Sequence, residues 1–194
     1  MNKSVLISIN PPHTNNIFDG IKGIEWRTKP MPTGKHYCYE TRKCFGLGKV
    51  IGEFCIWRIK RYERVDLIPE EYIRLGCVPI EFLQAYSKGR PLYAHFIISP
   101  KRYDKPKELS CFSVADKAAI AMCQFRERAF NNPDDTNGAL LPGRYVCTED
   151  ELDWCVECRT KPLTRPPQSW CYVKEVNQGG MSEDQNCDMI VAVE

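Results

Sequence analysis

The sequence predicts an α+β fold, a small and mostly antiparallel β-barrel with flanking helices and a helical insert. Two observations predict it: apolar-polar alternation typical of strands occurs early and late in the chain, and helical periodicity is confined to short segments between them. The 194 residues, 43% hydrophobic and 27% charged, are enough for a packed core and exclude a wholly disordered chain. We expect a closed barrel because closure hides the sheet edges.

Strands dominate the first half of the chain. Residues 5–9 alternate and end at Asn10-Pro11-Pro12, where proline stops a strand. Residues 13–19 are expected as a short helix that Gly20 closes. Further strands are expected over 23–28, 35–40 and 49–65, the last long or bent and rich in β-branched and aromatic residues.

The pattern then changes to helices. Two short helices are expected over 69–76 and 79–88, since both begin with proline and acidic residues and are closed by glycine. A strand over 92–99 and a basic extended segment over 100–109 follow. Beyond them the sequence predicts helices over 114–130 and from 148, a linker over 162–167, and strands over 169–175 and 189–193.

Charge divides the chain into two parts. Residues 1–112 carry 19 Lys and Arg against 11 Asp and Glu, whereas 113–194 carry 8 against 14. The basic part favours a polyanionic partner, and the acidic insert is a candidate for binding a protein.

One short motif brings charged residues together near the second predicted strand. It is Gly20-x-Lys22-x-x-Glu25-x-Arg27. Strand alternation places Glu25 and Arg27 on one face and Trp26 on the other, with Lys22 in the preceding turn. The set forms either an ordinary surface ion pair or a site in which a lysine beside a carboxylate acts as base or activates a nucleophile.

The motif and its neighbours resemble a known family. Together with the opening strand, the segments 37–39, 48–54, 103–109 and 166–173 follow the order seen in ASCH domains of the PUA-like superfamily, the last two as in phage and prophage members. The resemblance covers 5–112 and 166–174. Because residues 113–163 have no counterpart in such domains, we expect 1–112 together with 164–194 to form the barrel domain and 113–163 to form a mainly helical insert that contains cysteines. It implies a small barrel with a cleft beside Lys22, and a role in recognising RNA or modified nucleosides.

The resemblance leaves an enzymatic alternative open. Some ASCH proteins are amidohydrolases that remove the acyl group of N4-acetylcytidine with a lysine, a threonine three residues later and a downstream glutamate; others are described as ribonucleases. Lys22 matches the lysine, Glu25 stands where those amidohydrolases have threonine, and the candidates for the downstream acid are Glu70, Glu71 and Glu81. Lys22 and Glu25 are therefore the candidate catalytic residues.

Binding of RNA or a modified nucleoside is the leading expectation. Single-stranded RNA is recognised by stacking bases on aromatic side chains and by cations along its backbone. Aromatic and basic residues that adjoin each other in the sequence, together with the charged motif, give the candidate binding set: Lys22, Glu25, Trp26, Arg27, Tyr39, Lys101, Arg102, Tyr103, Ser169 and Trp170.

Eleven cysteines raise the question of a metal. The N-terminus shows no export signal and no segment is apolar enough to span a membrane, so we expect a cytoplasmic protein with free thiols and no cofactor. The alternative is zinc, because Cys155-x-x-Cys158 is half of a zinc-knuckle pattern that Cys147 and Cys171 would complete.

Overall fold

The structure, a computed structural model, describes residues 4–115 and 160–176. Its eight described strands form one sheet in the order β2-β5-β4-β3-β1-β8-β6-β7. Every neighbouring pair is antiparallel except β1 and β3, which are parallel. The mixed, mostly antiparallel sheet is thus confirmed, whereas β2 and β7 end the described order and barrel closure stays a prediction.

The first half of the chain follows the sequence-based expectation closely. β1 (Ser4–Ile9), α1 (His13–Phe18), β2 (Ile24–Arg27), β3 (Gly34–Glu40) and β4 (Val50–Tyr62) all lie where the patterns place them. β4 is a single strand of 13 residues whose register against β5 shifts at three points, so the strand bends. β1 lies between β3 and β8, and all its residues but the first are buried.

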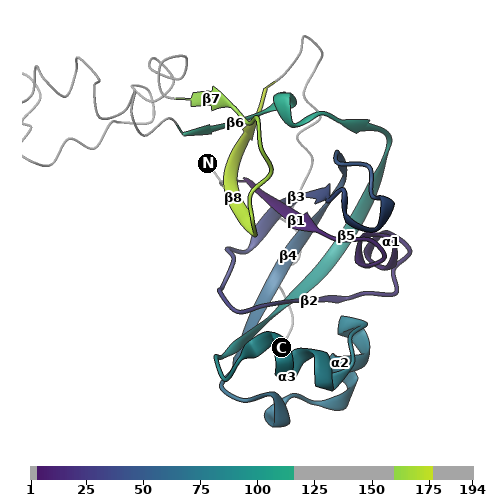
Figure 1. The fold of residues 1–194 in the computed structure, drawn as a ribbon, viewed down its shortest axis with the longest axis vertical. Coiled ribbons are helices and arrows are strands. Elements are labelled where there is room, and N and C mark those ends of the chain that lie inside the picture. Colours follow the sequence, from purple (N-terminus) through teal and green to yellow (C-terminus); the bar gives the residue numbers. More distant parts are fainter. Residues whose placement is uncertain (1–3, 116–159, 177–194) are drawn as a thin grey trace, which may run out of the picture.

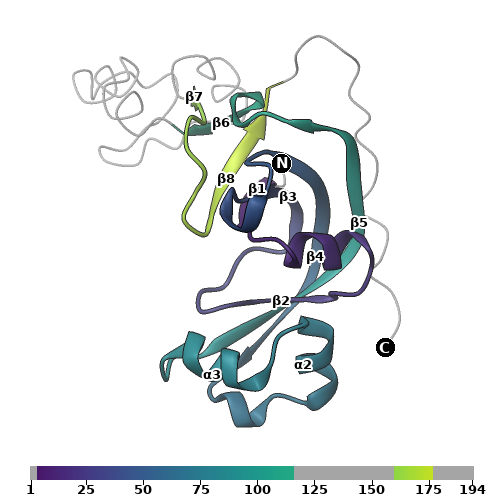
Figure 2. The same ribbon diagram turned by 45° about the vertical axis from the view of Figure 1, so that its right-hand side comes forward.

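Two helices lie at one end of the sheet. α2 (Glu70–Gly76) and α3 (Ile80–Ser87) are grouped beneath β2 in Figures 1 and 2. β5 (Leu92–Lys107) then runs for 16 residues, whereas the sequence predicts a strand that ends at 99. Pro100 does not end the strand because it lies at a shift in the register between β5 and β4. Proline has no N–H to donate, and at this shift the pairing with β4 does not need one. Ser99, just before it, has a φ of 51°.

The last described strands correct the start of the helix expected over 114–130. β6 (Phe112–Ala115) pairs with β7 (Thr160–Pro162) and with β8 (Trp170–Glu175). The helix expected from 114 is therefore wrong at Val114 and Ala115, because pairing with β7 overrides their local preference. The remainder of that helix, the acidic helix from 148 and the strand over 189–193 lie outside the described residues. The division into a barrel domain and an insert stays a prediction.

Three clusters of buried side chains hold the sheet and helices together. The cluster that contains Trp26, Tyr62, Leu83 and Ala94 fastens α2 and α3 to β2, β4 and β5. No helix in residues 4–115 and 160–176 is long and apolar enough to cross a membrane.

The described cysteines agree only in part with the expectation of free thiols. Five are free: Cys38, Cys44, Cys77, Cys111 and Cys171. The expectation is wrong for Cys55, which is disulfide-bonded.

The buried His36 predicts a pH dependence of stability. Burial lowers its pKa from 6.5 to about 4, although its hydrogen bond with the Gly34 carbonyl works in the opposite direction. Because the folded-state pKa lies below the unfolded value, the stabilisation is complete above pH 6.5 and is lost as the pH falls toward 4. We expect the linkage of His36 protonation to unfolding to lower the free energy of unfolding by about 2 kcal/mol when the pH is reduced from 7 to 5.

Urea unfolding at the two pH values measures this loss. His36→Phe is the matched variant, since the ring already stacks on Phe54 at a centroid distance of 5.7 Å. The variant should lose less stability on acidification than the parent, and an equal loss in both proteins would contradict the assignment.

Candidate functional site

The turn after α1 is held by backbone hydrogen bonds and places the Lys22 side chain in the protein interior. Gly20 adopts a φ of 74°, and the N–H groups of Ile21 and Lys22 both donate to the Asn16 carbonyl at 2.8 Å. The Gly23 N–H then donates to the Leu75 carbonyl of α2 at 2.9 Å. These bonds tie the turn to two helices and leave the Lys22 side chain almost completely buried.

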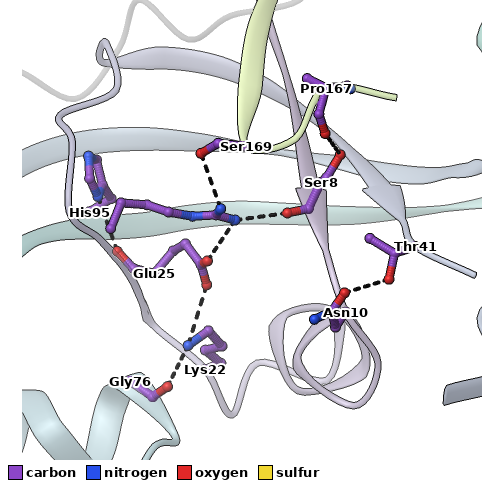
Figure 3. A network of polar contacts seen from close by, with 10 residues as sticks. Ser8, Asn10, Lys22, Glu25, Thr41, Gly76, His95, Pro167 and Ser169 are labelled. Carbon is purple, nitrogen blue, oxygen red and sulfur yellow. Dashed lines mark hydrogen bonds and ion pairs between the residues drawn. The ribbon is translucent and has the colours of Figure 1, made fainter. Parts of the chain in front are cut away.

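Lys22, Glu25 and Arg27 form one buried ionic cluster, shown in part in Figure 3. The Nζ of Lys22 lies 3.5 Å from Oε2 of Glu25, and Nη2 of Arg27 lies 3.0 Å from Oε1. Lys22 also donates to the Gly76 carbonyl at the end of α2. The three side chains are only 2%, 10% and 13% exposed, so this is no ordinary surface ion pair.

Arg27 joins segments that are far apart in the sequence. Its guanidinium donates to the Ser8 carbonyl on β1 at 2.9 Å and to Ser169 Oγ, just before β8, at 3.3 Å. Ser8 in turn donates from Oγ to the Pro167 carbonyl at 2.7 Å (Figure 3). The site is therefore built where β1, β2 and the segment before β8 meet.

His95, opposite Glu25 on the neighbouring strand β5, holds the backbone of Glu25 in place. Its Nε2 accepts the Met31 N–H at 2.9 Å, so Nδ1 must carry the proton that is donated to the Glu25 carbonyl at 3.1 Å. The ring is fully buried, and burial lowers its pKa, so it is held neutral. His95 thus orients the residue that balances the two cations.

The charges of the cluster keep Glu25 ionised. Burial alone would raise the pKa of its carboxyl, but the neighbouring Arg27 and Lys22 outweigh burial and lower it. His13 lies close by, and its pKa is lowered first by burial and then by Lys22. Its Nδ1 is buried and has no hydrogen-bond partner among the described residues.

A pocket of about 1040 Å³ opens over this cluster. Lys22, Glu25 and Arg27 all line it. Phe82 and Tyr86 of α3 line it too, with their rings stacked at a centroid distance of 6.1 Å and an interplanar angle of 11°. Arg42 and Lys43, both exposed, contribute cations to the lining. The pocket thus combines buried opposite charges, an aromatic pair and basic residues.

Six of the candidate binding residues belong to this region. Besides the ionic cluster, Trp26 and Tyr39 line the pocket, and Ser169 contacts Arg27. Trp26 is only 5% exposed and packs against Tyr62, so most of its ring is core. It approaches so close that a Cβ added at Gly76 would lie 2.2 Å from its Nε1, which explains glycine there.

The other four candidates do not line the pocket. Lys101 and Arg102 are exposed on β5, where Arg102 donates to Asn15 at 2.9 Å. Tyr103 donates to Glu53 at 2.5 Å, and Trp170 packs against the core cluster of β1, β3 and β4. Their role in nucleic-acid binding stays a prediction.

The glutamates proposed downstream of the motif lie elsewhere as well. Glu70, Glu71 and Glu81 are exposed on α2 and α3 and do not line the pocket. Among the described residues that do, the glutamate after Glu25 is Glu108, which pairs with Lys49 at 2.7 Å.

Several residues of the site escaped the sequence analysis. Ser8 acts mainly through its carbonyl, which has no residue signature. Phe82 and Tyr86 fit the apolar stripe of a predicted helix and look like core residues there. His95 sits in a strand, and only its register opposite Glu25 shows what it does.

The zinc alternative is not tested by the described residues. Within 4–115 and 160–176 no group of three or more His, Cys, Asp or Glu side chains is arranged to hold a metal ion. Cys171 is half-buried, and burial raises the pKa of its thiol. Cys147, Cys155 and Cys158 lie outside the described residues, so the four-cysteine set stays a prediction.

Comparison with known proteins bears on the fold. No protein-family model and no curated protein matches the chain. A serine-to-alanine mutant of the ZmASCH protein from Zymomonas mobilis matches its structure with a TM-score of 0.54 and 18% identity, covering 89% of each chain. The chain has an ASCH-like fold. A tyrosine-to-phenylalanine mutant of ZmASCH and the protein titled ASCH from the same organism follow at TM-scores of 0.49.

These two further structures are 18% and 19% identical to the chain and cover 81% of it, and the match covers 99% and 96% of their own lengths. The ASCH-like fold agrees with the resemblance seen in the sequence. At this identity the likeness concerns the fold, and the chemistry of the pocket has to be argued from its own residues.

Proposed function

We propose that this ASCH-like protein binds single-stranded RNA or a modified nucleoside, with one base in the pocket over Lys22, Glu25 and Arg27. The observation that carries the proposal is a buried ionic cluster that lines a pocket of about 1040 Å³. A pocket of this size is ample for a nucleoside. The resemblance to ASCH domains implies RNA or a modified nucleoside as the ligand, and the ASCH-like fold agrees with that resemblance.

The cluster retains hydrogen-bonding capacity for the edge of a base. An ammonium has three donors, and the Gly76 carbonyl and Glu25 engage two of those on Lys22. Glu25 is ionised and can accept a further bond from an exocyclic amine. The buried Nε of Arg27 and Nδ1 of His13 have no partner among the described residues, and such groups favour a polar ligand.

The pocket also offers a surface for the flat face of a base. Phe82 is 53% exposed although its ring stacks on Tyr86. An exposed aromatic ring beside polar groups is the usual platform for an unpaired base. Arg42 and Lys43 supply positive charge for a phosphate attached to that nucleoside.

We expect Arg27→Gln to weaken RNA binding about 10- to 100-fold, the range of one charge-assisted hydrogen bond. Titrations with oligocytidylate at fixed salt, read by fluorescence anisotropy, measure the loss. Arg61→Gln is the matched control, because Arg61 is exposed on β4 and does not line the pocket. A thermal melt of each variant shows that it is folded, and equal affinity of folded Arg27→Gln and parent would refute the proposal.

Hydrolysis of an N-acylated cytidine or of RNA is the second candidate. The contact between Lys22 and Glu25 beside the pocket favours it. The lowered pKa of Glu25 weighs against it, because a general base works best with a pKa near the working pH. Mass spectrometry of N4-acetylcytidine and RNA incubated with the protein, with Lys22→Ala as control, separates the candidates: turnover lost in the variant would make this an enzyme.

A further inference from the structure

Phe45 is the most exposed large apolar side chain of the described residues. It lies in the connection between β3 and β4 and is 104% exposed, so it has no packing contact that explains an aromatic residue there. Exposed aromatic rings cost free energy in water unless something covers them. Its chain neighbours include the exposed cations Arg42 and Lys43.

The backbone holds Phe45 outward in a fixed geometry. Cys44 and Phe45 have φ values of 49° and 63°, the left-handed region that residues with a Cβ rarely adopt. The N–H of Gly46 donates to the Lys43 carbonyl at 3.0 Å, and the N–H of Leu47 donates to Glu40 Oε2 at 2.8 Å. A Cβ added at Gly46 would lie 1.9 Å from the Thr41 carbonyl oxygen, so the turn is closely packed.

Glu40 anchors this turn from inside the protein. It is buried, and its other carboxylate oxygen accepts the Thr14 hydroxyl of α1 at 2.7 Å. The same carboxylate thus binds the helix and the turn. Strained backbone that its surroundings hold in place is typical of sites that present a side chain to a ligand.

The turn lies beside the proposed base pocket. Thr41, Arg42, Lys43 and Gly48, on both sides of Phe45 in the chain, line the pocket, whereas Phe45 does not. Arg42 lies across the turn, where a Cβ added at Gly48 would be 2.6 Å from its Nε. Arg42 and Lys43 therefore line the pocket and also lie within three residues of the exposed Phe45 ring in the chain.

We propose that Phe45 stacks on the base next to the one in the pocket, while Arg42 and Lys43 contact the phosphate between the two nucleotides. The inference rests on the proposed function and narrows its substrate class to a single-stranded polynucleotide. Stacking on an aromatic ring combined with cations along the backbone is how such strands are held without regard to sequence. The charge of the turn favours this polyanion over an apolar protein segment.

The test compares two probes, oligocytidylate and free cytidine, on the same variants. Phe45→Ala should weaken oligocytidylate binding roughly tenfold and leave cytidine binding unchanged, because only the strand has a second base. Phe45→Trp should retain the affinity. Leu47→Ala is the matched control, since Leu47 is an apolar residue of the same turn, 58% exposed, with no aromatic ring.

A second variant tests the phosphate contact. Lys43→Gln should lower the slope of log affinity for oligocytidylate against log salt by about 0.7, the effect of one phosphate contact on a single strand. An unchanged slope overturns that part of the inference.

The failures of the two proposals are distinguishable. If the parent binds oligocytidylate and Phe45→Ala binds it equally well, the stacking role is wrong and the pocket proposal stands. If Phe45→Ala weakens cytidine binding to the same degree, the ring acts through the shape of the pocket and the inference is also wrong. If the parent binds neither probe, the proposed function itself fails.

Discussion

Glu25→Ala is expected to lower the free energy of unfolding by about 3–5 kcal/mol, because it leaves two buried cations without their counter-charge. Lys22 and Arg27 lie 3.5 and 3.0 Å from the carboxylate, and both are nearly excluded from water. Lys22 would keep only the Gly76 carbonyl as a described partner. Urea unfolding of the variant and the parent at neutral pH measures the loss.

The control for this effect is an exposed acidic residue. Asp104→Ala on β5 removes the same charge from the surface and should change stability by less than about 0.5 kcal/mol. A comparable, small loss for both variants would show that the cluster is as hydrated as a surface pair. Acidification gives a second measure, since the pKa of Glu25 is lowered in the folded protein.

The sign of that pH effect follows from linkage. A carboxyl with a lowered folded-state pKa stabilises the protein fully above its ordinary pKa of 4.5, and the stabilisation is lost as the pH falls through the folded value. The parent should therefore lose stability below about pH 4.5 more steeply than Glu25→Gln, which has no charge to lose.

His95→Leu should cost about 2–6 kcal/mol, because it leaves two buried backbone groups unpaired at about 1–3 kcal/mol each. These are the Met31 N–H and the Glu25 carbonyl, which the ring now binds at 2.9 and 3.1 Å. Leucine matches the ring roughly in size, so the loss reflects the hydrogen bonds more than a cavity. Thermal and urea unfolding measure it.

A companion variant separates hydrogen bonding from packing. His95→Gln keeps one donor and one acceptor and should recover part of the stability that His95→Leu loses. Equal losses for the two variants would mean that the ring acts through its shape. Binding of oligocytidylate to folded His95→Gln then reports whether the Glu25 backbone position matters for the pocket.

Much of this structure could be predicted from local patterns in the sequence. The strands up to β4 and both short helices follow from alternation, proline and glycine, which act over a few residues. The same alternation brought Glu25 and Arg27 to one face and sent Trp26 to the core, because both depend only on neighbours within a strand.

Features that depend on contacts between segments far apart in the sequence could not be predicted. The contacts of Arg27 with Ser8 and Ser169 require that β1 and the segment before β8 be adjacent, which no local pattern encodes. Val114 lost its helical preference for the same reason. Lys101, Arg102 and Tyr103 show the same limit, because a basic and aromatic cluster looks the same in sequence whether or not it lines the pocket. Arg102 and Tyr103 bind Asn15 and Glu53, and the role of all three toward a nucleic acid stays a prediction.

The position of β1 between β3 and β8 also has a consequence for synthesis on the ribosome. When β5 has left the exit tunnel, β1 can already pair with β3, but its other edge has to wait until residues 170–175 are made. Ser169, the late partner of Arg27, arrives at the same moment. A nascent chain can therefore pair the strands from β1 to β5 early, while the pocket is complete only after Gln168 and Ser169 have been made.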